Sequence, residues 1–211
     1  SVWMVAVAGV LSVLTAASAF SREREERTLP LLFLTDIGAG ELLASRLGLS
    51  FLSNGLLVLS TLPLFVLSVS LGGVVVEQVL AAYALLLATV FACTSVGLLA
   101  ASAARSDFGA RLLALCTAGA LFGAVPSVAD DVVTRFGLSH GRVLLDCLSP
   151  LYAMEDIADP RHIVRALGHV AFSAIAGGAF LAAGWLCLRR NRVKAEWAAP
   201  VEILRRRNES A

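Results

Sequence analysis

The sequence predicts an all-α membrane protein with about five transmembrane helices, and two observations carry this prediction. The first is composition: 58% of the 211 residues are hydrophobic, only 16% are charged, and the mean hydropathy is +0.81. Soluble domains have about a quarter of their residues charged. The second is a set of five charge-free runs close to or above the ~20 residues that cross a bilayer. They are Ser1–Ser21, Leu47–Val76, Gln78–Ala104, Leu112–Ala129 and Ala166–Leu188.

We interpret the whole chain, residues 1–211, as one transmembrane domain. The expected spans are about 2–20, 49–72, 79–103, 109–129 and 166–188. Between them we expect a cytoplasmic elbow at 21–48, an outer segment at 130–165 and a cytoplasmic tail at 189–211. A buried helix of a soluble protein usually has only about 10–14 apolar residues in a row, which makes five such runs typical of a membrane protein.

Local sequence features refine the spans. The turn residues Leu71-Gly72-Gly73 indicate a tight connection, so the second and third spans form a helical hairpin. Pro63 lies inside the second span and predicts a kink there. In the fifth span, small residues at Ala174, Gly178 and Ala182 predict a face that packs closely against another helix.

Basic residues predict the orientation of the chain. If the first span runs inward, thirteen Arg and Lys residues lie on the cytoplasmic side and four lie outside. Cytoplasmic loops carry the excess of basic residues in membrane proteins. The sequence therefore predicts a cytoplasmic C-terminus. The net charge of +1 provides no basic face for a nucleic-acid partner.

The segment after the first span has a distinctive charge pattern. Six charged residues, Arg22 to Arg27, follow the apolar run at Ser21. On a helix, Arg22 pairs with Glu26 and Glu23 with Arg27 at i,i+4 spacing. Pro30 then interrupts the helix, and Thr35 or Asp36 can cap a second short helix. We expect an amphipathic elbow on the inner membrane face.

This elbow resembles the type-2 family of ABC exporter permeases, which has an E-R-E-x-x-T-L stretch after its second span and then T-P-x-S-x-x-E-[IL]-x-x-G-K. The first motif matches at Glu23, Arg24, Glu25, Thr28 and Leu29, and the second at Thr35, Glu41 and Leu42. Four positions depart from the second motif: Asp36, Gly38, Ser45 and Arg46. The stretch Leu148-Ser149-Pro150-Leu151-Tyr152 also resembles an S-P-[LF] element between the family's last two spans.

The resemblance implies a permease in the bacterial cytoplasmic (inner) membrane whose elbow contacts a separate ATPase chain. It implies coupling residues at Arg22, Glu23, Arg24, Glu25, Arg27, Thr28, Thr35, Glu41 and Arg46. It also implies a second permease copy, identical or related, around a central path. Because the family begins in the cytoplasm, we expect a further span before Ser1.

The energy source is expected on the partner chain. No G-x-x-x-x-G-K-[ST] motif occurs in the sequence, so ATP and Mg²⁺ would bind the ATPase and this chain would not itself be catalytic. No charge is expected in the membrane core, which argues against a proton relay, and the spans contain few polar groups. The polar groups are Ser53, Asn54, Ser60, Thr61, Thr94 and Ser95. An apolar path favours a lipid-like or amphipathic cargo.

The acidic outer segment at 130–165 favours short helices in the membrane interface. His140, His162 and His169 match no metal-ligand spacing, so we expect no metal site, and we expect His169 at the interface. Two other functions were weighed. A membrane-embedded enzyme would need a His, Asp or Glu cluster at membrane depth, which the spans lack. A non-transporting subunit that uses the ATPase for signalling or protein maturation remains an open alternative.

Overall fold

The computed structural model describes residues 2–20, 38–72, 75–104, 106–124, 126–128, 131, 135, 150, 153 and 163–209, the last with side chains to residue 190. Within these residues the chain is helical, with turns between the helices and no strand. The helices are α1 (Val2–Ala17), α4 (Ala39–Leu59), α5 (Leu62–Ser70), α6 (Val76–Ala103), α7 (Asp107–Gly119) with the π-helical turn η1 (Ala120–Ala124), and α11 (Ile163–Glu209). The predicted helical fold class is therefore confirmed.

Four helices in the described part of the chain are long and apolar enough to cross a membrane. They cover Gly40–Leu67, Val76–Ala103, Asp107–Val128 and Leu167–Arg190. The fifth expected span corresponds to α1, whose 16 residues extend about 24 Å, less than the ~30 Å hydrocarbon layer. A multi-pass membrane protein is thus supported, while the count of five spans is not confirmed.

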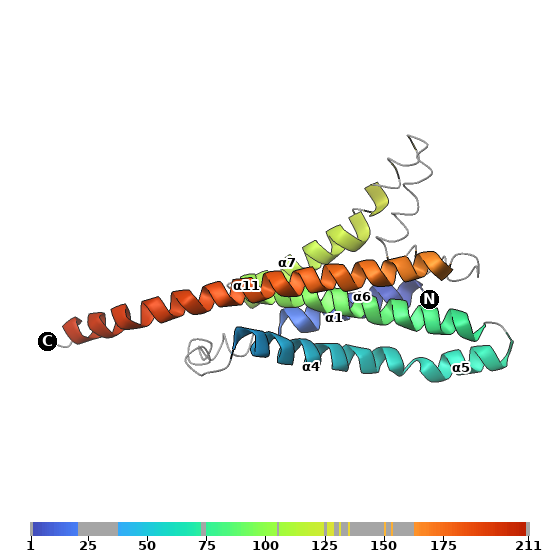
Figure 1. Ribbon diagram of the computed structural model, residues 1–211, viewed down its shortest axis with the longest axis horizontal. Helices are drawn as coiled ribbons and strands as arrows, with labels where there is room; N and C mark the ends of the chain where they lie inside the picture. The colour runs from blue at the N-terminus through green and yellow to red at the C-terminus, as the bar shows by residue number, and fades with distance from the viewer. Residues whose placement is uncertain are drawn as a thin grey trace.

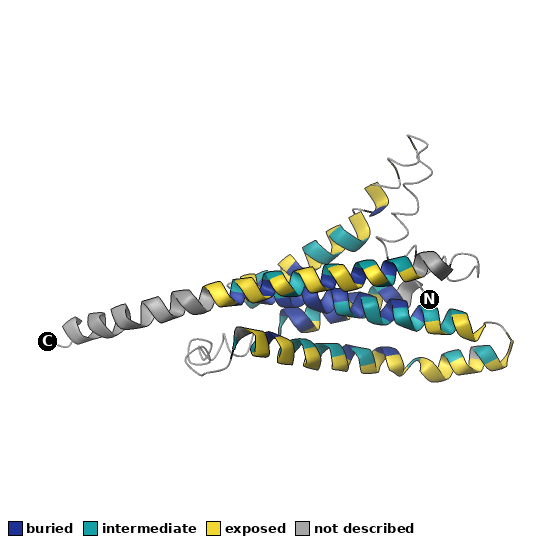
Figure 2. Ribbon diagram, viewed as in Figure 1, coloured by how far each residue is buried: buried dark blue, intermediate teal, exposed yellow. Residues whose placement is uncertain are grey.

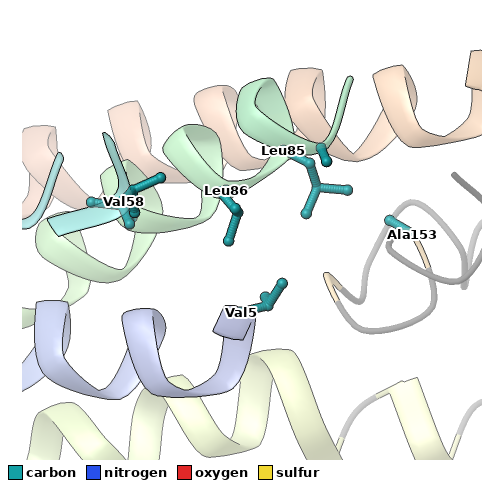
Figure 3. Close-up of a cluster of buried hydrophobic side chains, with 7 residues drawn as sticks. Val5, Val58, Leu85, Leu86 and Ala153 are labelled. Carbon is teal, nitrogen blue, oxygen red and sulfur yellow. The ribbon is translucent and has the colours of Figure 1, made fainter. Parts of the chain in front are cut away.

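Helix α6 forms the centre of the bundle (Figure 1). It packs against α11, α1, α7 and α4, and its side chains are the most buried of any helix, as Figure 2 shows. By contrast, α4 and α7 expose most of their apolar residues. One core cluster, shown in Figure 3, joins Val5 of α1 and Val58 of α4 to Leu85 and Leu86 of α6, with Ala153 at one end. A membrane protein can expose the remaining apolar faces to lipid.

The predicted hairpin and kink are both present. Gly72 has φ of 74° between α5 and α6, a left-handed conformation that glycine adopts at low cost. Helix α4 ends at Leu59, and α5 begins with Pro63 in its first turn, where a missing N–H costs nothing. The proline therefore divides the second span into two helices.

The start of the second span differs from the prediction. The second short helix expected from Thr35 or Asp36 is continuous with the span, because α4 begins at Ala39 with Gly38 as its N-cap. Glu41 and Arg46 therefore belong to the helix of the candidate span Gly40–Leu67 rather than to a separate elbow helix. The rest of the expected elbow, residues 21–37, and most of the outer segment at 130–165 lie outside the described residues.

Within this chain, the last span packs on α6 through other small residues than the three expected to form a packing face. The three residues expected on that face, Ala174, Gly178 and Ala182, are exposed on α11. Gly177 and Gly184, on an adjacent face of the same helix, are buried against α6. A Cβ added to Gly177 would lie 2.6 Å from Phe91. Small residues were the correct signal, but the sequence contains them on adjacent faces, and the neighbouring helix selects only one.

Candidate functional site

The candidate site lies at the end of the bundle where α1 and α6 end and α4 and α7 begin, the end from which α11 extends (Figure 1). Of the nine predicted coupling residues, the structure describes Glu41 and Arg46. The other seven, Arg22, Glu23, Arg24, Glu25, Arg27, Thr28 and Thr35, lie outside the described residues. The geometry of this end therefore rests on the first two turns of α4 and what they contact.

Glu41 fixes the beginning of α4. Its Oε2 accepts a hydrogen bond of 3.2 Å from the backbone N–H of Gly38, the N-cap residue. The carboxylate also lies in the first turn, where the helix dipole favours negative charge. Since Gly38 has no side chain to cap the helix, Glu41 alone supplies the side-chain part of the cap.

Arg46 connects α4 to the end of α1. Its guanidinium carbon lies 5.9 Å from the centre of the Phe20 ring, within the range of a cation–π contact. Phe20 itself is buried. The basic residue of the second motif is therefore held against the turn that follows α1.

The same end is joined to α11 through Trp185. A Cβ on Gly40 would lie 3.6 Å from the Trp185 Nε1 atom, so the first turn of α4 directly contacts the indole. The Arg189 guanidinium lies 5.4 Å from the Trp185 ring centre. An apolar hollow of about 300 Å³ opens between α4 and α11, lined by Leu43, Leu47 and Trp185 among others.

A buried apolar cluster locks these helix ends together. It contains residues from α1, its C-terminal turn, α4, α6 and α11: Ala16, Phe20, Leu43, Leu98, Ala101 and Leu188. A displacement of the first turn of α4 must therefore move, or be resisted by, three other helices, because packed interiors transmit strain.

A second cavity lies on another side of α1. It has a volume of about 220 Å³ between α1, α6 and α7. Its walls are mainly apolar, including Val10, Val13 and Phe122, and its polar groups are Thr89 and Cys93 on α6. Figure 1 shows α7 diverging from the other helices. The cavity accepts apolar groups in preference to ions.

His169 occupies a different environment from the interface expected for it. It is fully buried, and its Nε2 atom lies 2.9 Å from the Ser173 Oγ and 3.5 Å from the Thr89 Oγ1. The other two histidines, His140 and His162, lie outside the described residues. The residues that the structure describes contain no group of three potential metal ligands.

Sequence reasoning missed Phe20, Gly40 and Trp185. Aromatic residues next to arginines at the ends of apolar runs are a recognisable interface signal, and they could have identified Phe20 and Trp185. Gly40 carries no such signal, since only the packed indole explains it. Comparisons with known proteins return no match for this chain among family models, curated proteins or solved structures.

Proposed function

We propose that this chain is the membrane-spanning permease subunit of an ATP-driven ABC transporter, acting as an exporter with a separate ATPase subunit. The motifs of residues 23–42 suggest the family, and one structural observation supports coupling. The first turns of α4, with Glu41 and Arg46, are packed against the ends of α1 and α11. A partner that pushes on this helix end acts on the bundle as a lever.

In this mechanism the ATPase binds the charged elbow from the cytoplasm and moves it when ATP binds and is hydrolysed. The residues assigned to the contact are Arg22, Glu23, Arg24, Glu25, Arg27, Thr28, Thr35, Glu41 and Arg46. Motion of α4 passes to α1 through Arg46 and Phe20 and to α11 through Trp185. Two permease copies alternate between inward-open and outward-open states around a shared path.

The proposed cargo is lipid-like or amphipathic. The charged residues of the four candidate spans lie toward the helix ends, and the cavity between α1, α6 and α7 is mainly apolar. Desolvating an ion in such a cavity is costly without a paired charge. An acyl chain or another apolar group enters it without that penalty.

The first experiment is co-purification of the full-length protein, from membranes of its host, with candidate ABC ATPase chains. One variant reverses the charges of Glu23, Glu25 and Arg27. A matched control reverses the charges of Asp131 and Arg135, an exposed i,i+4 pair. This pair follows the C-terminal end of α7, whereas the elbow end of the bundle is where α7 begins. We expect the ATPase to bind the native protein and the control, and to be lost from the elbow variant.

An absence of any ATPase on the native protein would contradict the permease proposal. Equal binding to the native protein and the elbow variant would place the coupling contact elsewhere. Transport is tested separately, with the permease–ATPase complex in vesicles and a fluorescent phospholipid as cargo. ATP hydrolysis with no movement of this lipid contradicts the proposed cargo class.

A further inference from the structure

A third apolar hollow, a groove, lies between α1 and α4, on the opposite side of α1 from the cavity between α1, α6 and α7. It has a volume of about 320 Å³. Its lining residues are Val7, Ala8, Leu11, Asn54, Leu57, Val58, Thr61 and Leu86. The rims are exposed apolar side chains, among them Val7, Leu11 and Leu57. Two polar side chains, Asn54 and Thr61, interrupt this apolar surface.

The hydroxyl of Thr61 is already used. Its Oγ1 lies 2.7 Å from the carbonyl oxygen of Val58, to which it donates, and 3.0 Å from the Tyr83 hydroxyl. The Thr61 hydroxyl therefore needs no further partner, and Asn54 is the polar residue of the groove that remains to be examined.

The amide of Asn54 is oriented by two acceptors. Its Nδ2 donates to the backbone carbonyl of Ser50 at 2.8 Å and to the Thr15 Oγ1 at 3.0 Å. Thr15 directs its own proton to the carbonyls of Leu11 and Ser12, so its oxygen can only accept from Asn54. The contact with the Ser50 carbonyl, which can only accept, requires the nitrogen and so assigns the two ends of the amide.

Both hydrogen bonds of Asn54 use its amide nitrogen, so its carbonyl oxygen, Oδ1, takes part in neither of them. Asn54 is only 3% exposed, and no described residue donates a hydrogen bond to its Oδ1. This oxygen is nevertheless not one of the fully buried polar atoms that lack a hydrogen-bond partner. The oxygen thus opens onto the groove. Asn54 also lies at the middle of the candidate span Gly40–Leu67, about 20 Å along the helix axis from either end of that span.

We propose that this groove is the docking site for one more transmembrane α-helix, apolar along its length and carrying a hydroxyl, amide or indole donor at the depth of Asn54. An unpaired acceptor in hydrocarbon is unfavourable, and polar side chains join helices in membranes for this reason. Acyl chains fill apolar grooves but have no donor, and headgroup donors do not reach the bilayer centre. The occupant is therefore a helix rather than lipid.

Two adjacent leucines of α4 provide a matched test. Leu57 lines the groove and Leu56 does not, although their exposed fractions are 56% and 57% and they lie at the same depth. A photo-crosslinking amino acid replaces either residue in the full-length protein, expressed in its native host. After irradiation of intact membranes, mass spectrometry identifies what each position has captured.

At position 57 we expect a peptide from a transmembrane segment outside residues 1–211 that contains a donor side chain, and at position 56 we expect lipid. Asn54→Leu should abolish the peptide adduct, whereas Ser60→Ala should leave it, since the Ser60 hydroxyl bonds its own helix at Leu57. Lipid adducts at both positions, or attachment of position 57 only to peptides of residues 1–211, would overturn the proposal. Neither result depends on whether an ATPase binds the elbow.

Discussion

Gly97 of α6 faces the backbone of Val13 of α1 so closely that a Cβ at position 97 would lie 2.7 Å from the Val13 carbonyl oxygen. The same Cβ would lie 2.6 Å from the Ala16 Cβ and 3.0 Å from the Ala17 backbone nitrogen. Backbone atoms cannot move aside as a flexible side chain can. The distance between α1 and the central helix is therefore set by the absence of a side chain at one position.

Gly97→Ala should lower the free energy of unfolding by about 1–3 kcal/mol, because the added methyl forces α1 away from α6. Alanine favours a helix over glycine by about 1 kcal/mol. A Gly→Ala substitution that causes no steric clash should therefore stabilise the protein. Gly178→Ala is the control, since a Cβ there meets nothing within 4 Å. Thermal unfolding in detergent checks both, and a Gly97→Ala protein as stable as the Gly178→Ala protein would refute the close approach.

The Asn54–Thr15 hydrogen bond should contribute measurably to the contact between α4 and α1. Hydrogen bonds between membrane helices are worth about 0.6 kcal/mol on average. A double-mutant cycle with Asn54→Ala and Thr15→Val should give a coupling energy of that size. A parallel cycle of Asn54→Ala with Ser60→Ala should be additive, because these side chains share no contact. Equal coupling in the two cycles would exclude a direct bond.

His169 should stabilise the contact between α11 and α6. His169→Leu removes the nitrogen that lies 2.9 Å from the Ser173 Oγ, and it leaves a buried group of Thr89 and Ser173 with fewer partners. We expect a loss of about 1–3 kcal/mol in the free energy of unfolding. His169→Gln keeps a hydrogen-bonding side chain and should lose less. If Gln and Leu destabilise the protein equally, packing rather than hydrogen bonding explains the effect of His169.

The orientation of the chain can be tested at two positions outside the apolar spans. Leu71, 86% exposed, lies in the hairpin turn, and Asn191 follows the last candidate span. In a protein without its native cysteines, Leu71→Cys should react with a membrane-impermeant maleimide in intact cells. Asn191→Cys should react only after the membrane is opened. The reverse pattern would overturn the cytoplasmic C-terminus predicted from the basic residues.

How far the sequence predicts the candidate site depends on the segment. The motif residues Glu41 and Arg46 were identified by resemblance, and the structure places both on the first two turns of α4. Their roles came from the structure alone. That Glu41 caps the helix and that Arg46 covers Phe20 are contacts set by where α4 begins and by how α1 ends. The charged residues 22–27 still rest on the sequence prediction.

By itself, the sequence determined the helical class, the hairpin at Gly72 and the break before Pro63, since apolar length and the backbone restrictions of glycine and proline act locally. Tertiary structure alone decided which faces meet. It selected Gly177 rather than Gly178 against Phe91, buried His169, and left the Asn54 carbonyl oxygen open to a groove. A helix surrounded by lipid has apolar residues on every side, so no periodicity marks its buried face, and only the positions of neighbouring helices define it.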